Sequence, residues 1–231
     1  RNFAIDPDRT PPRDVERAGE PCREAILRFD TSFGTGAALL RLKSTDTDPP
    51  RAWTLLTTLA SLAGADEDTM REAREEPAFD RDFQGPNWLD RRRQSARYAD
   101  RNPEVLVVGA GHAGLTASAA LKALGVDTLA VDRMARLGDN WRLRYHGLKL
   151  HNQVHSNHLP YLPFPRTWPR YIPKDKIANW LEFYAETLEL DVWTSTGFEG
   201  ATHDGVAWTA RLRQADGTIR TLRPRHIVMA T

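Results

Sequence analysis

The feature that most constrains this chain is a glycine turn placed between an apolar run and a helical pattern. The run Val105–Val108 leads directly into G-x-G-x-x-G over residues 109–114. A second apolar run, Thr128–Val131, comes after the helical pattern and ends on Asp132. This order of strand, glycine turn, helix, strand and acid is the dinucleotide-binding βαβ unit.

Each glycine of this motif has its own task. Gly109 permits the tight turn, Gly111 lets backbone approach a pyrophosphate, and Gly114 lets the helix pack closely on the sheet. His112 and Ala113 begin the helix. Their end of the helix offers unpaired N–H groups and the positive end of the helix dipole to the phosphates.

Asp132 stands where a carboxylate accepts hydrogen bonds from the ribose hydroxyls of a dinucleotide, about 20 residues beyond the motif. The alternative is that the glycines only make a strand-to-helix turn in an ordinary α/β domain. That alternative leaves Gly111 unexplained and makes Asp132 an accidental strand end, so the dinucleotide interpretation is favoured.

Length, charge and cysteine content limit the classes of protein to which this chain can belong. The 231 residues suffice for one or two domains. The net charge of +1, from 32 basic and 31 acidic residues, provides no field for nucleic acid or an anionic membrane. Cys22 is the only cysteine, so no intrachain disulfide can form, and we expect a reducing, cytoplasmic compartment. No segment is apolar enough for a membrane span.

Residues 1–97 differ in character from the rest of the chain, and we expect an irregular extension or linker there. Stretches rich in proline and charge bury too little apolar surface to offset their ordering entropy. The pattern predicts a loop over Arg1–Glu20 and a hairpin of two short strands, Ala38–Leu42 and Ala52–Leu59. It then predicts a charged helix over Asp66–Glu75, an irregular stretch over Pro77–Asp90 and a second charged helix over Trp88–Asp100.

Residues 98–231 form the predicted dinucleotide-binding domain, and the order of its elements separates two fold families. An amphipathic helix and a short strand are expected after the βαβ unit, and then three antiparallel strands and a last buried strand. An antiparallel meander before the return to the parallel sheet fits an FAD-binding domain better than a simple NAD domain. The predicted segments are Asp175–Leu188, Val192–Thr194, Thr196–Thr202, Val206–Arg213, Thr218–Leu222 and His226–Thr231.

Several separated motifs carry a family resemblance. They read VVGAGHAGL, LGDNWRLRYHGLKLHN, LPYLPFPRTWPRYIP and HIVMAT, all within residues 104–231. This part resembles the N-terminal FAD-binding portion of flavin-containing monooxygenases, especially the auxin-synthesis type and its fungal and bacterial relatives. Residues 50–103 resemble the segment before the FAD domain in fungal members. Residues 1–97 could thus hold a remnant of a nuclear-transport-factor-2-like domain.

The resemblance implies chemistry and further site residues. Such enzymes use NADPH to reduce FAD, and the reduced flavin uses O₂ to transfer one oxygen atom to a small organic substrate. Residues expected near FAD on this basis are Arg133, Gly138, Asn140, Trp141 and Thr231. His151 and Asn152 are expected to face the flavin, where a catalytic role would lie.

Some family features are missing from this chain. No second G-x-G-x-x-G comes after Gly114, so we expect a chain truncated before the NADPH domain and catalytically incomplete alone. A non-catalytic FAD-binding fragment or scaffold stays open, as does another FAD- or NAD(P)H-dependent oxidoreductase without a redox disulfide. Residues 138–150 contain no cysteine, which argues against a disulfide reductase. The substrate and oligomeric state remain unknown.

A histidine cluster raises the question of a metal. Helical spacing of His151, His155 and His158 could place three imidazoles on one face. The segment runs into Leu159–Pro160 and brings no partner carboxylate or cysteine. We therefore predict no metal site.

Overall fold

The computed structural model describes residues 2–43, 51–64 and 83–231. The chain divides into two compact units, Arg1–Ala73 and Arg74–Thr231. Each unit is built around its own β-sheet structure.

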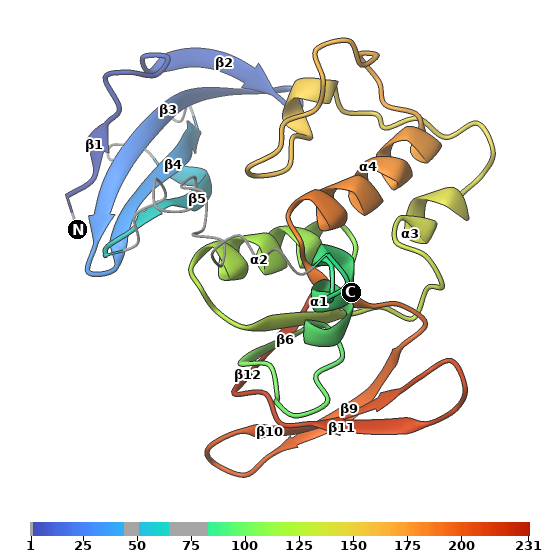
Figure 1. Ribbon diagram of the computed structural model, residues 1–231. Coiled ribbons are helices and arrows are strands. Elements are labelled where there is room, and N and C mark those ends of the chain that lie inside the picture. The colour runs from blue at the N-terminus through green and yellow to red at the C-terminus, as the bar shows by residue number, and fades with distance from the viewer. Residues whose placement is uncertain (1, 44–50, 65–82) are drawn as a thin grey trace. The chain divides into compact units, whose positions relative to one another are not determined.

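A parallel sheet of four strands forms the centre of the second unit, in the order β12-β6-β7-β8. The strands are β6 (Val105–Val108), β7 (Thr128–Val131), β8 (Asp191–Trp193) and β12 (His226–Met229). The helices α2 (His112–Ala123) and α4 (Lys174–Thr187) lie on one side of the sheet, and the antiparallel strands β9 to β11 lie on the other (Figure 1). The predicted Rossmann-like architecture is therefore confirmed.

The central strands are apolar throughout because both faces of the sheet are covered. Val105 and Val107 belong to the core under the helices, together with Ile177 and Leu181 of α4. The alternate residue Leu106 belongs to the core under the meander. Side chains of successive strand residues point to opposite faces, so a continuous apolar run supplies two cores at once.

The meander consists of β9 (Gly197–His203), β10 (Trp208–Arg213) and β11 (Ile219–Leu222) in the order β11-β10-β9. Both pairings are antiparallel, with Ala210 opposite Ala201 on one side and Leu222 on the other. Ala210 and Leu212 are fully buried against the sheet. The predicted antiparallel insertion and the predicted helix over Asp175–Leu188 are both confirmed within one to two residues.

Between β7 and α4 the chain forms a short helix, α3 (Asp139–Arg142), and a long loop with one 3₁₀ turn, η1 (Val154–Ser156). Leu150, Leu159 and Phe164 of this loop are buried in the core beneath the helices. The loop is irregular in backbone but packed in side chains, so it belongs to the body of the domain.

A helix from the predicted linker also packs on this domain. The helix α1 (Trp88–Ser95) begins at Asn87 with a reciprocal capping box to Asp90. Trp88 donates to the Glu189 carboxylate at 2.6 Å, and Arg92 lies 2.8 Å from Asp191 at the start of β8. The predicted helix over Trp88–Asp100 is present but ends earlier.

Tyr98 connects the end of this segment to the amino edge of the sheet. Its ring is 1% exposed, and its hydroxyl donates to Asp127 at 2.7 Å. Burial, reinforced by this hydrogen bond, raises the pKa of Tyr98. The Trp193 indole donates to the Ala96 carbonyl at 2.6 Å, and Arg220 donates to the Tyr98 carbonyl at 3.1 Å. Residues 88–98 are thus built into the second unit.

The first unit contains an antiparallel sheet where the sequence predicted mostly loop. Its strands are β1 (Ala4–Ile5), β2 (Arg13–Arg17), β3 (Glu20–Thr31), β4 (Gly34–Lys43) and β5 (Ala52–Leu62). The order is β1-β3-β4-β5, with β2 also paired to β3. The predicted hairpin exists as β4 and β5, but the predicted loop over Arg1–Glu20 is wrong. The described residues of this part form a sheet instead of an irregular extension.

Ion pairs across the strands explain why the charged sequence of this sheet is compatible with strands. Glu24 of β3 is buried and receives three guanidinium groups, from Arg13 at 3.2 Å, Arg17 at 3.1 Å and Arg41 at 2.8 Å. The hydrogen bonds from Arg41 and then Arg17 lower the pKa of Glu24 from 4.5 to about 2. Opposite charges on neighbouring strands stabilise pairing where apolar contacts are few.

Some expectations for this part stay open. The predicted helix over Asp66–Glu75 lies outside the described residues, as do residues 77–82 of the predicted irregular stretch Pro77–Asp90. The division of the chain at residues 97 and 98 remains a prediction, and so does the relation to a nuclear-transport-factor-2-like domain. Among the described residues, no helix is long and apolar enough to cross a membrane.

We predict that limited proteolysis of the whole chain leaves a protected fragment that begins before Asn87. The reason is that Trp88, Arg92 and Tyr98 are bonded at the amino edge of the parallel sheet, to Glu189, Asp191 and Asp127. Mass spectrometry of the time course identifies the first stable fragment. A fragment that begins near Pro103 would show that these contacts do not protect α1.

We also predict an acid-sensitive first unit. Because the folded pKa of Glu24 lies below its ordinary value of 4.5, its contribution to stability is complete above that value and is lost as the pH falls towards about 2. Glu24→Gln should destabilise the unit at neutral pH and flatten this acid dependence. Hydrogen exchange of the β3 and β4 amides measures both effects, with Glu16→Gln on β2 as the control. Identical acid profiles for Glu24→Gln and the wild type would contradict the assignment.

Candidate functional site

The candidate site is a groove at the carboxyl edge of the parallel sheet, with a volume of about 470 Å³. The carboxyl ends of the parallel strands are where α/β folds bind ligands. Six of the predicted site residues line the groove: Gly109, Gly111, Asp132, Arg133, Asn140 and Thr231. The other lining residues are Val108, Val131, Met134, Thr196, Gly197, Phe198, Met229 and Ala230.

Two glycines of the motif are required by packing. Gly109 has φ +101°, and a Cβ there would lie 2.6 Å from the Ala230 carbonyl oxygen. A Cβ on Gly114 would lie 1.7 Å from the Gly109 carbonyl oxygen. Any side chain at either position would displace backbone, as the sequence interpretation of these two glycines expects.

Gly111 has a different environment. A Cβ there would meet only the Asn140 side-chain amide nitrogen, at 3.2 Å, and no backbone within 4 Å. Gly111 is also the N-cap of α2, and no side chain caps the helix from that position. Packing within the protein therefore does not require a glycine at position 111. The absence of a side chain here keeps the first N–H groups of α2 accessible from the groove.

Asp132 is held by the backbone in the structure. One carboxylate oxygen accepts from the Ala110 N–H at 2.8 Å, and the other accepts from the Met134 N–H at 2.8 Å. The predicted partner was a ribose hydroxyl. The sequence motif did not indicate this second role, in which the acid ties the glycine turn to the turn after β7.

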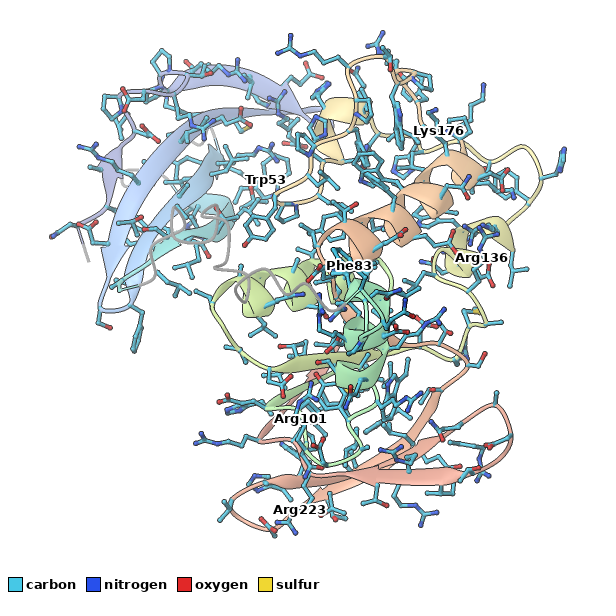
Figure 2. All side chains as sticks on the ribbon, viewed as in Figure 1. Trp53, Phe83, Arg101, Arg136, Lys176 and Arg223 are labelled. Carbon is cyan, nitrogen blue, oxygen red and sulfur yellow. The ribbon has the colours of Figure 1, made fainter. Side chains whose placement is uncertain are left out.

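The short helix α3 is fixed against α4 beside the groove. Gly138 has φ +85°, and a Cβ there would lie 2.4 Å from the Ala178 carbonyl oxygen. The Arg142 guanidinium donates to Asp139 at 3.1 Å and to Glu182 of α4 at 3.0 Å. Arg136, labelled in Figure 2, also pairs with Glu182. These contacts set the position of Asn140 and Trp141 on α3.

The rings of His112 and Trp141 meet where α2 begins. Their centroids are 5.4 Å apart at an interplanar angle of 80°, and the Trp141 indole nitrogen lies 3.4 Å from His112 Nδ1. Burial lowers the pKa of His112. Neither ring lines the groove at the carboxyl edge, although both flank the glycine turn.

The expected flavin-facing residues lie elsewhere in the domain. His151 and Asn152 are exposed in the loop after Leu150 and do not line the groove. Their predicted role stays a prediction. The segment Thr196–Phe198 lines the groove although the sequence interpretation did not select it. Its position directly after the third parallel strand was the signal that could have identified it.

The histidine cluster does not gather into a ligand set. His155 lies in the 3₁₀ turn η1, and His158 accepts from the Phe164 N–H at 3.0 Å. Within residues 2–43, 51–64 and 83–231, no group of three or more His, Cys, Asp or Glu side chains could hold a metal ion.

Comparison with known proteins agrees with this geometry. Residues 102–149 match the family described as FAD binding domain. The indole-3-pyruvate monooxygenase YUCCA1 of Oryza sativa subsp. japonica is 35% identical over 130 residues, which are 56% of this chain and 32% of that protein. The chain thus spans about a third of the length of this curated relative.

Solved structures show the same fold. A flavin-containing monooxygenase from Stenotrophomonas maltophilia has a TM-score of 0.52 and 25% identity, covering 57% of this chain and 38% of that chain. The bacillithiol disulfide reductase Bdr from Bacillus cereus has a TM-score of 0.53 at 17% identity, covering 56% of this chain and 39% of that chain. At that identity the second similarity describes the fold alone.

The fold and the groove together define a class, the Rossmann-type dinucleotide-binding domain, and the family match within it is to an FAD binding domain. Within that class, the sequence and structural similarities are to flavin monooxygenases and cover the N-terminal FAD-binding portion. The resemblance recognised in the motifs from residue 104 onwards is therefore confirmed.

We predict that Asp132→Ala lowers the stability of the domain even without a cofactor. The substitution leaves the Ala110 and Met134 N–H groups without their acceptor, at a cost of about 1–3 kcal/mol in the free energy of unfolding. Denaturant unfolding of the cofactor-free chain measures the change, and Arg133→Ala is the neighbouring control. Equal stability of Asp132→Ala and the wild type would mean that the carboxylate does not brace the turn.

Proposed function

We propose that this chain is the FAD-binding portion of a flavin-dependent monooxygenase that uses NADPH and O₂ to insert one oxygen atom into a small organic substrate. The single observation that carries the proposal is the groove at the glycine turn, where Gly111 opens the start of α2. The match of residues 102–149 to the FAD binding domain family supports the choice of FAD. Similarity to an indole-3-pyruvate monooxygenase and to a flavin-containing monooxygenase supports the reaction class.

The residues around the groove fit an adenine dinucleotide. The N–H groups at the start of α2, from His112 to Gly114, would bind the pyrophosphate, and Gly109 and Gly111 would allow its close approach to the backbone. Asp132 would accept from the adenosine ribose, and the exposed Arg133 would cover the adenine. Further contacts along the cofactor are proposed for Gly138, Asn140, Trp141 and Thr231, with His151 and Asn152 facing the flavin.

The chain's own contribution is binding and orientation. FAD supplies the redox chemistry when bound, and the protein positions it and limits access of water. The positive end of α2 stabilises the phosphate charge without a basic side chain. NADPH would bind in a part of the parent protein outside this chain, and we propose a reducing cytoplasmic compartment and no nucleic-acid partner.

Two alternatives have different signatures. A non-catalytic FAD-binding scaffold would hold the cofactor but would not oxidise NADPH in the parent protein. Another FAD- or NAD(P)H-dependent oxidoreductase would oxidise NADPH without incorporating oxygen. Measuring NADPH consumption by the full-length parent, with ¹⁸O₂ and a panel of sulfur, nitrogen and ketone compounds, distinguishes them. Product that carries ¹⁸O supports the monooxygenase, and peroxide alone across the panel would count against it.

For the chain itself we predict FAD binding in preference to NAD(H). Gly111→Val should weaken FAD binding at least about tenfold, or about 1.4 kcal/mol, because the side chain blocks approach to α2. Gly147→Val is the matched control, since a Cβ at Gly147 meets nothing within 4 Å. Titration of each variant with FAD and NADH, with circular dichroism to verify folding, tests this. Tight NADH binding without FAD binding would overturn the cofactor assignment.

A further inference from the structure

The pair His112 and Trp141 joins two elements that are far apart in sequence. His112 is the first residue of α2, directly after the glycine turn, and Trp141 lies in α3. The indole nitrogen of Trp141 is 3.4 Å from His112 Nδ1, and the rings pack edge to face. Next to this pair, the Asn140 side-chain amide nitrogen lies 3.2 Å from the position that a Cβ on Gly111 would occupy.

The far side of α3 is already fixed. Gly138 packs on the backbone of Ala178, and Arg142 is bonded to Glu182 and Asn179 of α4. The Lys174 ammonium, which is buried, donates to the Arg142 carbonyl at 2.8 Å. The backbone of α3 therefore cannot follow the glycine turn freely. The side chain of Trp141 makes the contact between α3 and the residue that follows the glycine turn.

We propose that His112 is a positioning residue that accepts the Trp141 indole N–H and thereby locks α3 against the glycine turn before FAD enters. This inference rests on the proposed function, and it assigns the His112 side chain a role that is separate from the cofactor contact proposed for the His112 backbone N–H. A turn held in this way presents the N–H groups of α2 in a fixed arrangement, which reduces the ordering cost of binding.

The chemistry of the pair requires one form of the imidazole. An indole N–H is a donor only, so Nδ1 must be unprotonated and the neutral ring carries its proton on Nε2. Burial lowers the pKa of His112, which favours that neutral form. The Arg144 guanidinium lies over the Trp141 ring, 5.5 Å from its centroid. A cation over the ring face does not compete for the indole N–H, which lies in the plane of the ring.

Two substitutions of His112 whose side chains have similar shapes distinguish the contribution of the hydrogen bond from that of packing. In His112→Asn the amide oxygen sits the same number of bonds from Cα as Nδ1 does, so an acceptor is retained. His112→Leu has the same branching without any acceptor. In the cofactor-free chain, the indole ¹H–¹⁵N resonance of Trp141, assigned by its loss in Trp141→Phe, reports the bond directly. We expect faster solvent exchange and a shifted resonance in His112→Leu, and values near the wild type in His112→Asn.

FAD affinity provides the second measurement. We expect His112→Leu to weaken FAD binding by about fivefold to tenfold and His112→Asn by less than about threefold, as one hydrogen bond between neutral groups would give. Trp141→Phe combined with His112→Leu should be no weaker than Trp141→Phe alone. Equal behaviour of the Asn and Leu variants in both measurements, or fully additive losses, would overturn the lock. If the wild type binds no FAD, the proposed function fails, while the resonance still decides whether the lock exists.

Discussion

The contact between Gly114 of α2 and the carbonyl of Gly109 is the constraint on which the rest of the domain depends. A Cβ on Gly114 would lie 1.7 Å from that oxygen, so the helix can start here only because Gly114 lacks a side chain. The same turn is closed from the other side by Ala230, which comes directly after the neighbouring strand β12. One turn thus sets the distance between helix and sheet and aligns the start of α2 with the carboxyl edge.

The two edges of the parallel sheet differ in whether their charged groups are paired with one another. At the amino edge a second cavity of about 510 Å³ is lined by charges that pair with one another, such as Arg101 with Asp127 at 3.0 Å and Arg92 with Asp191 at 2.8 Å. Paired ions attach residues 88–101 to the strand starts and add no net charge. At the carboxyl edge the groove has the helix N-terminus, the exposed Arg133 and the Asp132 carboxylate, which accepts two backbone N–H groups. The helix N-terminus favours an anionic group at its own end of that groove.

The sequence predicted the parts of the fold whose signals are local. The apolar strands and the glycine turn each specify their structure within a few residues. Only the β4–β5 hairpin of the first unit was predicted. The other strands were not, because Glu24 on β3 is compatible with a strand through arginines on β2 and β4. The groove was predicted on its glycine side. Its opposite wall, Thr196–Phe198, is brought there by the crossover through α3 and α4, which no local pattern encodes.

Asp132 shows how one side chain can serve the fold and a ligand together. Each of its oxygens accepts one backbone N–H in the structure, yet an ionised carboxylate offers about four acceptor sites. The two bonds fix the carboxylate in one orientation beside the groove and leave acceptor capacity for hydroxyl groups. A carboxylate fixed in this way does not have to lose side-chain entropy when a ribose binds. The two backbone hydrogen bonds, which the sequence did not predict, therefore hold Asp132 in an orientation that suits the ribose contact that we propose.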